Sequence, residues 1–351
     1  MTDTLHDLIV VGGGQAGLAT AFHATRRGWK TLILEAGPAP TGSWPRFYDS
    51  LTLFSPARHS SLPGMPFPGD PGRYPQRDEV VEYLAKYAAG LDAQIAASRP
   101  ATSATWDAGV FTVSTPDRVF QSRRVVNATG GFATPHRPEL PGLDGFFGTV
   151  LHSAEYVAPQ TFSGQHVVVV GAGNSAVQIA TELATTAKVT LTSRHPVKFL
   201  PQRPFGRDIH DWLHWTRLGH GRPSLLLKRG VVAVLDDGHH QRALQSGNPL
   251  WRPMFTRLDR DQARWADGSA ERVDVVLLAT GFRPALSHLD GLYGASGASA
   301  VDRDGVPLHR QGVSHTVAGL GFVGLEWQRG FASATLRGVG PDAAHVLRRL
   351  R

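Results

Sequence analysis

Short apolar runs, helical segments and glycine-rich turns follow one another in the same order at two places in the chain. At the first, an apolar run at residues 8–11 precedes a helical segment that Gly28 ends, and another run follows at 31–34. Runs this short and uniformly apolar are typical of parallel strands buried on both faces. The order recurs at 166–170, 174–186 and 189–192. The pattern therefore predicts two β-α-β units built around parallel sheets.

The remaining segments predict further elements around these two units. Residues 44–70 lack a regular period, which is typical of a functional loop, and 135–165 read as a crossing between domains. Asp78 is expected to cap a helix whose apolar stripe is Val80, Leu84 and Tyr87. The other expected elements are short strands within 102–127, helices at 208–218 and 331–350 (the latter interrupted near 338–341), a hairpin at 256–273 turning at Asp267-Gly268, strands at 275–278 and 316–323, and a turn at Asp304-Gly305.

The chain is thus expected to leave its first domain, form a second one, and return. We predict an α/β protein with two Rossmann-like three-layer dinucleotide-binding domains, the second inserted in the first. The first domain would comprise residues 1–157 and 275–351, and the second residues 158–274. Two small-residue turns, Ala128-Thr129-Gly130 and Ala279-Thr280-Gly281, end one buried strand in each part.

The first glycine-rich turn has the spacing GxGxxG, formed by Gly12, Gly14 and Gly17. In a dinucleotide site the first glycine allows a tight turn, the second lets the backbone approach a pyrophosphate, and the third lets helix and strand pack closely. The pyrophosphate binds free N–H groups at the helix N-terminus. Glu35 ends the next strand, where it can accept hydrogen bonds from a ribose diol. This unit is expected to bind FAD or NAD.

The second turn reads GxGxxA, formed by Gly171, Gly173 and Ala176. Arg194 stands as far from Gly171 as Glu35 stands from Gly12. An acid there would repel a 2′-phosphate, whereas arginine binds one with a forked, charge-assisted contact. The second unit is therefore expected to bind NADPH, with NADH as a further substrate left open. The alternative is that the second helix differs in length and Arg194 is merely exposed.

Composition removes several function classes. The 351 residues include no cysteine, which excludes disulfides, thiolate metal sites, cysteine nucleophiles and a redox-active dithiol. The formal net charge is +7, but the basic residues are spread along the chain, so we expect no nucleic-acid partner. No apolar run approaches the length of a membrane span, and Asp3 and Asp7 stand where a signal peptide has basic residues. We expect a cytoplasmic protein with no metal site and no membrane contact.

One further motif narrows the comparison. Phe146, Gly148, His152 and Tyr156 spell FxGxxxHxxxY just before the second glycine-rich turn. With GSW at 42–44, SSLPGMPFP at 60–68 and YPQRDEV at 74–80, the chain resembles small bacterial flavin-containing monooxygenases and the related Baeyer–Villiger and N-hydroxylating enzymes over nearly its whole length. Two positions depart from that pattern. Tyr156 stands where Baeyer–Villiger members usually carry Trp, and Phe54 stands where many members carry an Asn that steadies the oxygenated flavin.

The resemblance implies an FAD- and NADPH-dependent monooxygenase. By it, a flavin hydroperoxide would oxygenate a thioether, an amine or a ketone, with molecular oxygen and a small-molecule substrate as partners and a homodimer left open. Phe54 and Trp44 would face the flavin, and His152 and Tyr156 would lie near the domain junction. The implied cofactor-binding residues are Gly12, Gly14, Gln15, Ala16, Gly17, Glu35, Ala36, Ser43, Trp44, Ala128, Thr129, Gly130, His152, Tyr156, Gly171, Gly173, Asn174, Ser175, Ala176, Ser193, Arg194, Thr280 and Gly281.

Two other functions stay open at this point. The first is a flavin-dependent NAD(P)H reductase that passes electrons to a quinone, dye, metal ion or protein. The second is a nucleotide sensor or scaffold without catalysis. A thioredoxin-reductase mechanism is excluded because the dithiol is missing. The sequence does not name the substrate, because residues 196–251, which would shape its pocket, show no readable period.

Overall fold

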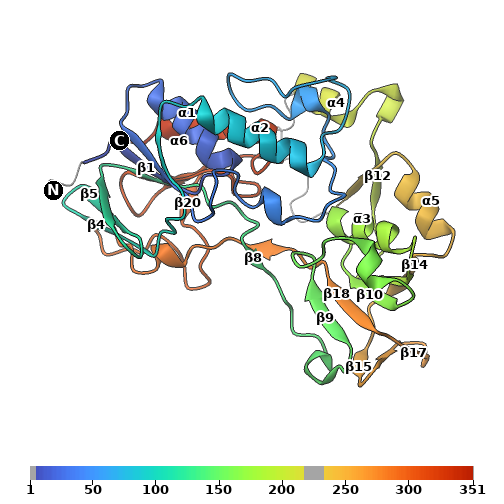
Figure 1. Ribbon diagram of the computed structural model, residues 1–351. Coiled ribbons are helices and arrows are strands. Elements are labelled where there is room, and N and C mark those ends of the chain that lie inside the picture. Colours follow the sequence, from blue (N-terminus) through green and yellow to red (C-terminus); the bar gives the residue numbers. More distant parts are fainter. Residues whose placement is uncertain (1–4, 217–232, 351) are drawn as a thin grey trace.

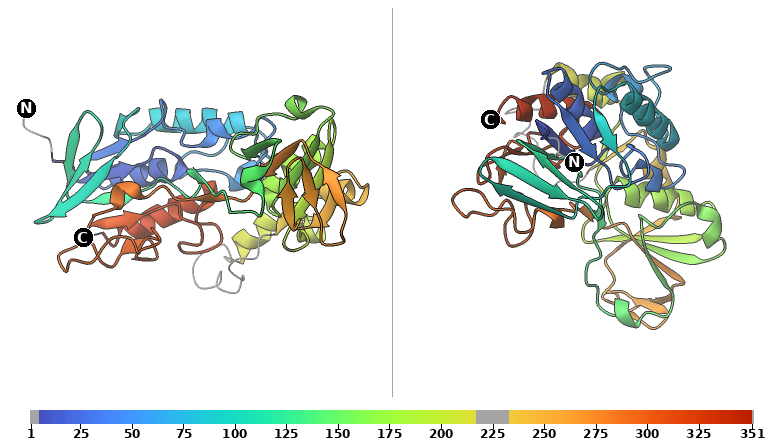
Figure 2. Two further views of the ribbon diagram at one scale, coloured as in Figure 1. Left: turned by 90° about the horizontal axis from the view of Figure 1, so that it is seen from below. Right: turned by 60° about the vertical axis from the view of Figure 1, so that its left-hand side comes forward.

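The computed structural model describes residues 5–216 and 233–350. Two α/β domains lie side by side in it, joined by two crossing segments near β8 (Figure 1). The first domain carries both ends of the described chain, and the second is formed by the middle of the sequence (Figure 2). The predicted fold class, with one domain inserted in the other, is confirmed.

The first domain is built on a seven-stranded sheet. The five strands from β22 to β3 run parallel to one another, and β20 and β21 continue the sheet beyond β22 as antiparallel strands. In spatial order the strands are β20 (His309–Arg310), β21 (Val313–Ser314), β22 (Leu320–Phe322), β7 (Val125–Asn127), β1 (Leu8–Val11), β2 (Thr31–Leu34) and β3 (Gln94–Ala96). The expected strand at 316–323 is thus shorter, because residues 316–319 form the turn before β22.

Two different layers cover this sheet, which explains why β1 is apolar at every position. Leu8 and Val10 pack against the helices, whereas Ile9 and Val11 pack against the antiparallel sheet on the other face. The helices are α1 (Gln15–Thr25), α2 (Arg77–Ala89) and α6 (Leu336–Leu347), and the antiparallel strands are β4 (Ser103–Asp107), β5 (Val110–Ser114) and β6 (Val119–Ser122). Full burial of both faces requires a continuous apolar run rather than an alternating one.

Two expectations about these helices were wrong. Gln76, not Asp78, is the N-cap of α2: the Glu79 carboxylate accepts a hydrogen bond from the Gln76 N–H at 2.9 Å, while Asp78 pairs with Arg77 on the surface. Helix α6 is continuous through residues 338–341, and residues 331–335 before it form turns. Pro341 lies only five residues after the first residue of α6, so its missing N–H interrupts one early hydrogen bond and does not end the helix.

The second domain repeats the layered plan on a five-stranded parallel sheet. In spatial order its strands are β14 (Leu250–Pro253), β11 (Lys188–Ser193), β10 (His166–Val170), β18 (Val275–Leu278) and β9 (Thr149–His152). Val167 and Val169 face the layer of α3 (Asn174–Leu183), and Val168 and Val170 face the ribbon of β15 (Arg257–Asp259), β16 (Gln262–Arg264) and β17 (Ala270–Arg272). Asp267-Gly268 forms the predicted turn between β16 and β17, and Arg260-Asp261 adds a second turn.

Sheet membership moves the predicted domain boundaries outward. Strands β9 and β18 belong to the second sheet, although they lie outside residues 158–274, because they pair with each other in parallel at that sheet's edge. By this measure the second domain runs from 149 to 278, and part of the expected crossing at 135–165 is one of its strands. The crossing segments themselves meet as a small antiparallel pair, β8 (Thr134–Pro135) with β19 (Phe282–Arg283).

The segment that sequence patterns left largely unassigned belongs to the second domain and reaches the loop of the first domain at Arg58. It contains β12 (Phe199–Pro201), α4 (Ile209–Trp215), β13 (Val234–Asp236) and α5 (His239–Gln245). Helix α4 confirms the expected helix here, although Leu218, its predicted end, lies outside the described residues. Among residues 5–216 and 233–350, no helix combines the length and the hydropathy that crossing a bilayer requires.

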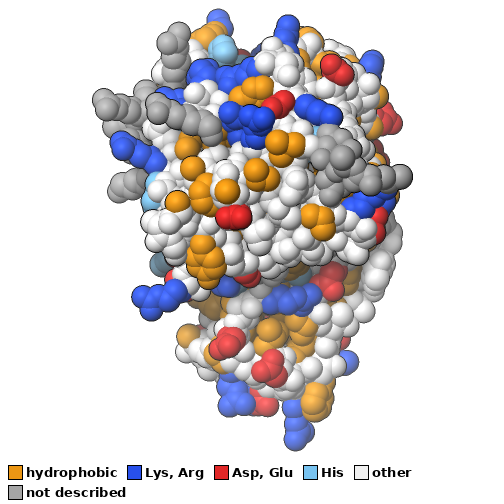
Figure 3. All heavy atoms as spheres, turned by 90° about the vertical axis from the view of Figure 1, so that its left-hand side faces the viewer, with side chains coloured by type: hydrophobic (Ala, Val, Ile, Leu, Met, Phe, Trp, Pro, Cys, Tyr) orange, Lys and Arg blue, Asp and Glu red, His pale blue; other side chains and the backbone are white. Residues whose placement is uncertain are grey.

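The basic residues are distributed over the surface. On the face in Figure 3, Lys and Arg side chains lie in several separate groups, with hydrophobic and acidic side chains between them. Nucleic acid binding favours a continuous basic patch or stripe. The expectation of no nucleic-acid partner stays a prediction.

Candidate functional site

The first glycine-rich turn is closely packed on its strand and leaves a helix end free. A Cβ atom on Gly12 would lie 2.6 Å from Ala128 O, and one on Gly17 would lie 1.8 Å from Gly12 O. Helix α1 follows with Gly14 as its N-cap, without a side-chain cap and without an acid in its first turn. Its first N–H groups and its dipole are therefore available to an anion, which fits a pyrophosphate.

Glu35 is held at the end of β2 beside this turn. The side chain is buried, and its two carboxylate oxygens accept hydrogen bonds from Gly13 N and Gly37 N, each at 2.6 Å. A carboxylate oxygen has a second lone pair, so each can accept a further hydroxyl. The backbone thus fixes the acid in the position where a ribose diol would meet it.

Residues 42–44 return to the same turn. A Cβ on Gly42 would lie 2.8 Å from Gly14 Cα, and the Trp44 indole N–H donates to Gln15 Oε1 at 2.9 Å. The Gln15 amide in turn donates to Ala334 O at 3.4 Å, just before α6. The structure therefore brings Gly42, Trp44 and Gln15 together at the first fingerprint, and their contact with a cofactor, like that of Ser43, stays a prediction.

The second glycine-rich turn repeats the first in detail. A Cβ on Gly171 would lie 2.4 Å from Ala279 O, as one on Gly12 would approach Ala128 O. The two small-residue turns therefore have the same task, because each ends the strand beside a fingerprint and lets its first glycine approach. Helix α3 also begins without a side-chain cap and without an acid in its first turn, with Gly173 as N-cap. The uncapped N-terminus of α3 therefore fits the pyrophosphate of a second dinucleotide.

Strand register corrects the equivalence inferred from spacing. Gly12 and Gly171 donate to Leu34 O and Thr192 O, so the residue that matches Glu35 in the second domain is Ser193, with Arg194 next. The connection from β10 to β11 is one residue shorter. The buried Ser193 hydroxyl donates to His195 O at 2.6 Å and accepts from Trp251 Nε1 at 3.0 Å. Arg194 is exposed and makes no hydrogen bond or ion pair with the described residues.

His152 and Tyr156 lie at the domain junction and are both buried. The His152 Nε2–H donates to Gly281 O at 3.0 Å, and Nδ1 accepts from Ala154 N at 3.1 Å. Burial lowers the pKa of His152, so the ring is neutral. The Tyr156 hydroxyl donates to Glu182 Oε2 at 2.8 Å, which ties the segment after β9 to α3. Both side chains have protein partners, so contact with a cofactor stays a prediction.

The other predicted residues divide between the two turns. Ala16 and Ala176 are buried in the helices, while Ala36 lies exposed after Glu35. Thr129 bonds Asn127 and Ala285, and Thr280 donates to His136 O. Gly130 and Gly281 have positive φ, and Asn174 and Ser175 open α3.

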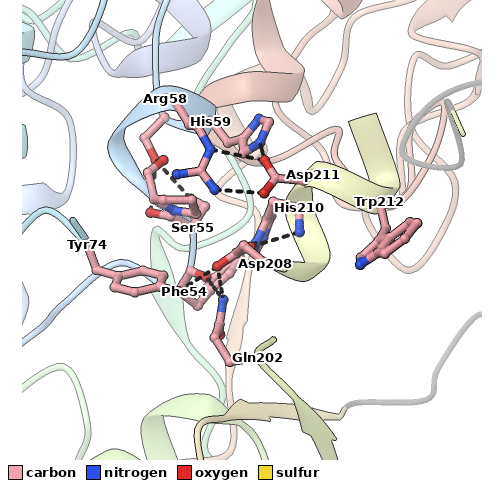
Figure 4. Close-up of polar contacts among 12 residues, drawn as sticks. Phe54, Ser55, Arg58, His59, Tyr74, Gln202, Asp208, His210, Asp211 and Trp212 are labelled. Atoms are coloured by element: carbon pink, nitrogen blue, oxygen red, sulfur yellow. Dashed lines mark hydrogen bonds and ion pairs between the residues drawn. The ribbon is translucent and has the colours of Figure 1, made fainter. Parts of the chain in front are cut away.

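Phe54 leads to a polar cluster that sequence reasoning missed. Its ring stacks on His210 with centroids 5.9 Å apart, and its carbonyl accepts from Gln202 Nε2 at 3.1 Å (Figure 4). Asp208, the N-cap of α4, accepts hydrogen bonds from Tyr74, Gln202 and His210. Burial raises the pKa of Asp208, but these hydrogen bonds outweigh it and hold the pKa well below its usual range. The only sequence signal was Asp208 preceding a helical pattern.

Asp211 joins α4 to the loop of the first domain. Arg58 donates to both of its oxygens, Nε to Oδ1 at 3.0 Å and Nη2 to Oδ2 at 2.7 Å, and His59 Nε2 lies 2.7 Å from Oδ1 (Figure 4). The Arg58 hydrogen bonds, with a smaller contribution from His59, lower the pKa of Asp211 to about 2. The two domains are thus connected by a bidentate ion pair.

This pair predicts a pH-dependent contribution to stability. A lowered pKa in the folded state stabilises the fold above the unfolded pKa of roughly 3.9, and the contribution disappears as pH falls toward 2. Asp211→Asn should therefore lower the free energy of unfolding by about 1–2 kcal/mol at pH 7, with the difference shrinking below pH 4. Thermal unfolding monitored by circular dichroism between pH 3 and 7 measures this. Asp78→Asn, on an exposed surface pair, is the control; equal losses in the two variants would contradict the prediction.

Known proteins resemble this chain over most of its length. A family model described as "Pyridine nucleotide-disulphide oxidoreductase" matches residues 9–208. An oxidoreductase of Geobacillus kaustophilus named CzcO-like is 32% identical over 97% of each chain, and the indole-3-pyruvate monooxygenase YUCCA1 of rice is 31% identical over 78% of this chain and 76% of its own. The structure of a flavin-containing monooxygenase from Stenotrophomonas maltophilia superimposes with a TM-score of 0.83 at 33% identity, covering 98% of both chains.

These likenesses agree with the two fingerprints and with the motif at 146–156. They also bear out the two cofactors, FAD and NADPH, and an NAD(P)H-dependent flavin oxidoreductase. With its glycine turns, its inserted second domain and these relatives, the chain belongs to the flavin-containing monooxygenase family.

Proposed function

We propose that this enzyme uses NADPH and molecular oxygen to oxygenate small soft nucleophiles, such as thioethers and amines, or ketones. The observation that supports this most directly is the pairing of two uncapped helix ends with different strand ends. One has Glu35 beside it, and the other has Ser193 and the exposed Arg194. These suit a ribose diol and a 2′-phosphate respectively. FAD, when bound, supplies the oxygen-activating chemistry. The protein would align the nicotinamide on the flavin, shield the reacting atoms from water and admit the substrate.

The chain's own residues define what each part would do. The α1 end, Glu35 and the 42–44 loop would hold FAD, and the α3 end with Arg194 would hold NADPH. His152 and Tyr156 would keep the second domain in place through Gly281 and Glu182. The cysteine-free sequence leaves no dithiol to accept the electrons, which separates this chain from the disulfide reductases that its family model also describes.

A flavin reductase is the second candidate, and Phe54 favours it. Where many resembling proteins carry Asn, this position has an apolar ring stacked on His210. Such a residue offers no hydrogen bond to the flavin, which would favour passing electrons to a quinone, dye, metal ion or protein.

The cytoplasmic location and the possible homodimer stay predictions.

Product analysis distinguishes the two functions. Purified, FAD-loaded protein is supplied with NADPH, oxygen and a thioether, and sulfoxide, hydrogen peroxide and NADPH are quantified together. We expect the amount of sulfoxide formed to match most of the NADPH consumed. With an amine or a ketone as substrate, the matching product should be the amine oxide or the ester. Stoichiometric hydrogen peroxide with every substrate class would overturn the monooxygenase proposal in favour of the reductase.

A further inference from the structure

Three histidines form a row that runs from the surface to a buried position beside Phe54. His214 is exposed at the end of α4, His59 is mostly buried, and His210 is 1% exposed. The ring centroids are 5.5 Å apart between His214 and His59, and 6.3 Å apart between His59 and His210. The last ring stacks on Phe54 (Figure 4). Among the described residues no hydrogen bond joins two of these rings, so a proton would pass from one to the next through a bridging water.

The two inner rings are oriented by carboxylates. His210 Nδ1 lies 2.8 Å from Asp208 Oδ1, and His59 Nε2 lies 2.7 Å from Asp211 Oδ1. Ionised carboxylates only accept hydrogen bonds, so each ring donates an N–H to its carboxylate, and whenever a ring is neutral its other nitrogen is an acceptor. His210 Nε2 is buried and has no hydrogen-bond partner among the described residues. A buried acceptor without a partner calls for an explanation, such as an ordered water, an ion or a catalytic role.

The proposed reaction supplies a use for that nitrogen. NADPH, one proton, oxygen and the substrate become NADP⁺, water and the oxygenated substrate, so each turnover takes up one proton from solvent. A chamber that excludes water needs a route for that proton. We propose that His214, His59 and His210 relay protons between solvent and the reaction chamber beside Phe54, with Asp208 and Asp211 as positioning residues. The proposal rests on the monooxygenase function above.

The charges around His210 suit a relay rather than a fixed cation. Burial, the guanidinium of Arg337 and the neighbouring His59 lower the pKa of His210, and Asp208 opposes them. Around His59 stand Asp211, which Arg58 also binds, and the rings of His210 and His214. His210 is therefore neutral at pH 7 and would carry its extra proton only in passing. Because Nδ1–H stays bonded to Asp208, Nε2 would both take up the proton that arrives by way of His59 and give it up to the chamber, and the ring is neutral again afterwards.

Nitrogen NMR tests the tautomer without relying on turnover. In protein labelled with ¹⁵N-histidine, we expect His210 to be protonated at Nδ1 and unprotonated at Nε2, its signals being identified by their disappearance in His210→Asn; the buried His166, whose Nδ1 donates to Arg272 O, should give a second Nδ1–H pattern that this variant keeps. Asp208→Asn should raise the share of the Nε2–H form. A His210 signal protonated at Nε2 in the unaltered protein would overturn the relay, because that nitrogen would not accept a proton.

Two isosteric variants separate the relay from packing. His210→Asn places an amide N–H where Nδ1 lies and keeps the Asp208 contact, whereas His210→Gln places its amide near Nε2 and loses that contact. We expect both to lower oxygenation by roughly 100-fold, since positioned acid–base groups contribute about 10²–10⁴. Anaerobic reduction of the flavin by NADPH should stay unchanged. Oxygenation near the unaltered rate in His210→Asn would show that only the Asp208 contact matters, and would overturn the proposal.

The exposed end of the row offers a variant that leaves folding intact. His214→Asn should lower oxygenation several-fold at pH 8, where protons are scarce, and added imidazole should restore it. His239 is an exposed histidine of α5, and His239→Asn is the control. It should change neither the rate of oxygenation at pH 8 nor the response to imidazole. No effect of His214→Asn at any pH would contradict the relay. If the unaltered enzyme itself makes hydrogen peroxide and no oxygenated product, the function fails instead, and the NMR result still decides the state of His210.

Discussion

Replacing Gly17 by Ala should produce a protein that folds poorly and is purified without flavin. A methyl group at this position would lie 1.8 Å from Gly12 O and 3.0 Å from Gly12 C, both backbone atoms of the turn that α1 follows. Relief requires α1 to move away from β1, which displaces the N–H groups that would hold the pyrophosphate. Overpacking of this kind costs about 3 kcal/mol, so we expect the flavin dissociation constant to rise at least ~100-fold. The flavin absorbance per protein and a fluorescence titration with FAD measure the change.

Gly28→Ala is the matched control for this substitution. Gly28 has a positive φ of 75°, unlike the helical Gly17, and a Cβ there would meet nothing within 4 Å. We expect a loss of about 1 kcal/mol in stability from backbone strain, and full retention of flavin. The second fingerprint tolerates Ala176 at the position equivalent to Gly17, so the requirement is specific to the first turn. Normal flavin content in Gly17→Ala would show that α1 and β1 are less closely packed than described.

Replacing Arg194 by Gln should remove the preference for NADPH. Arg194 is exposed at the end of β11 and makes no hydrogen bond or ion pair with the described residues, so its guanidinium is available to a 2′-phosphate. A hydrogen bond to a charged group contributes about 1.5–3 kcal/mol, which corresponds to a roughly 10- to 100-fold increase in KM for NADPH. NADH lacks the phosphate, so its KM should hardly change. Steady-state oxidation of both nucleotides at fixed ionic strength gives the two values.

A neighbouring cation separates a direct contact from a general field effect. Lys198 is exposed shortly after Arg194, and Lys198→Gln removes the same charge. We expect less than about a 3-fold change with either nucleotide, because solvent screens exposed charges. Equal increases in KM for NADPH and NADH in Arg194→Gln would refute its role in phosphate binding. The β10–β11 connection is one residue shorter than its counterpart and places Ser193, not Arg194, opposite Gly171. The experiment therefore decides whether Arg194 binds the 2′-phosphate from the next position.

The two β-α-β units were predictable because their signals are local. Uniform apolar runs such as Leu8–Val11 and the glycine spacing after them depend on residues next to one another, and β2 confirmed its expected limits at Thr31–Leu34. The strands at the edges of the sheets were less predictable. Strand β9 lies in a segment rich in Pro and Gly, and only its pairing with β18 makes it a strand. Likewise α6 runs through Pro341 because it packs along the first domain's core.

By itself, the sequence determined the fold class, the two dinucleotide turns with their Glu35 and Ser193-Arg194 ends, and the absence of a dithiol. Only the tertiary structure decided what surrounds Phe54. Asp208 bonds Tyr74, and Asp211 bonds Arg58 and His59, across more than a hundred residues of sequence. Such partners leave no periodic or spacing signal, because each polar residue alone reads as a cap or an exposed side chain. They become one hydrogen-bonded cluster only when the second domain folds against the first.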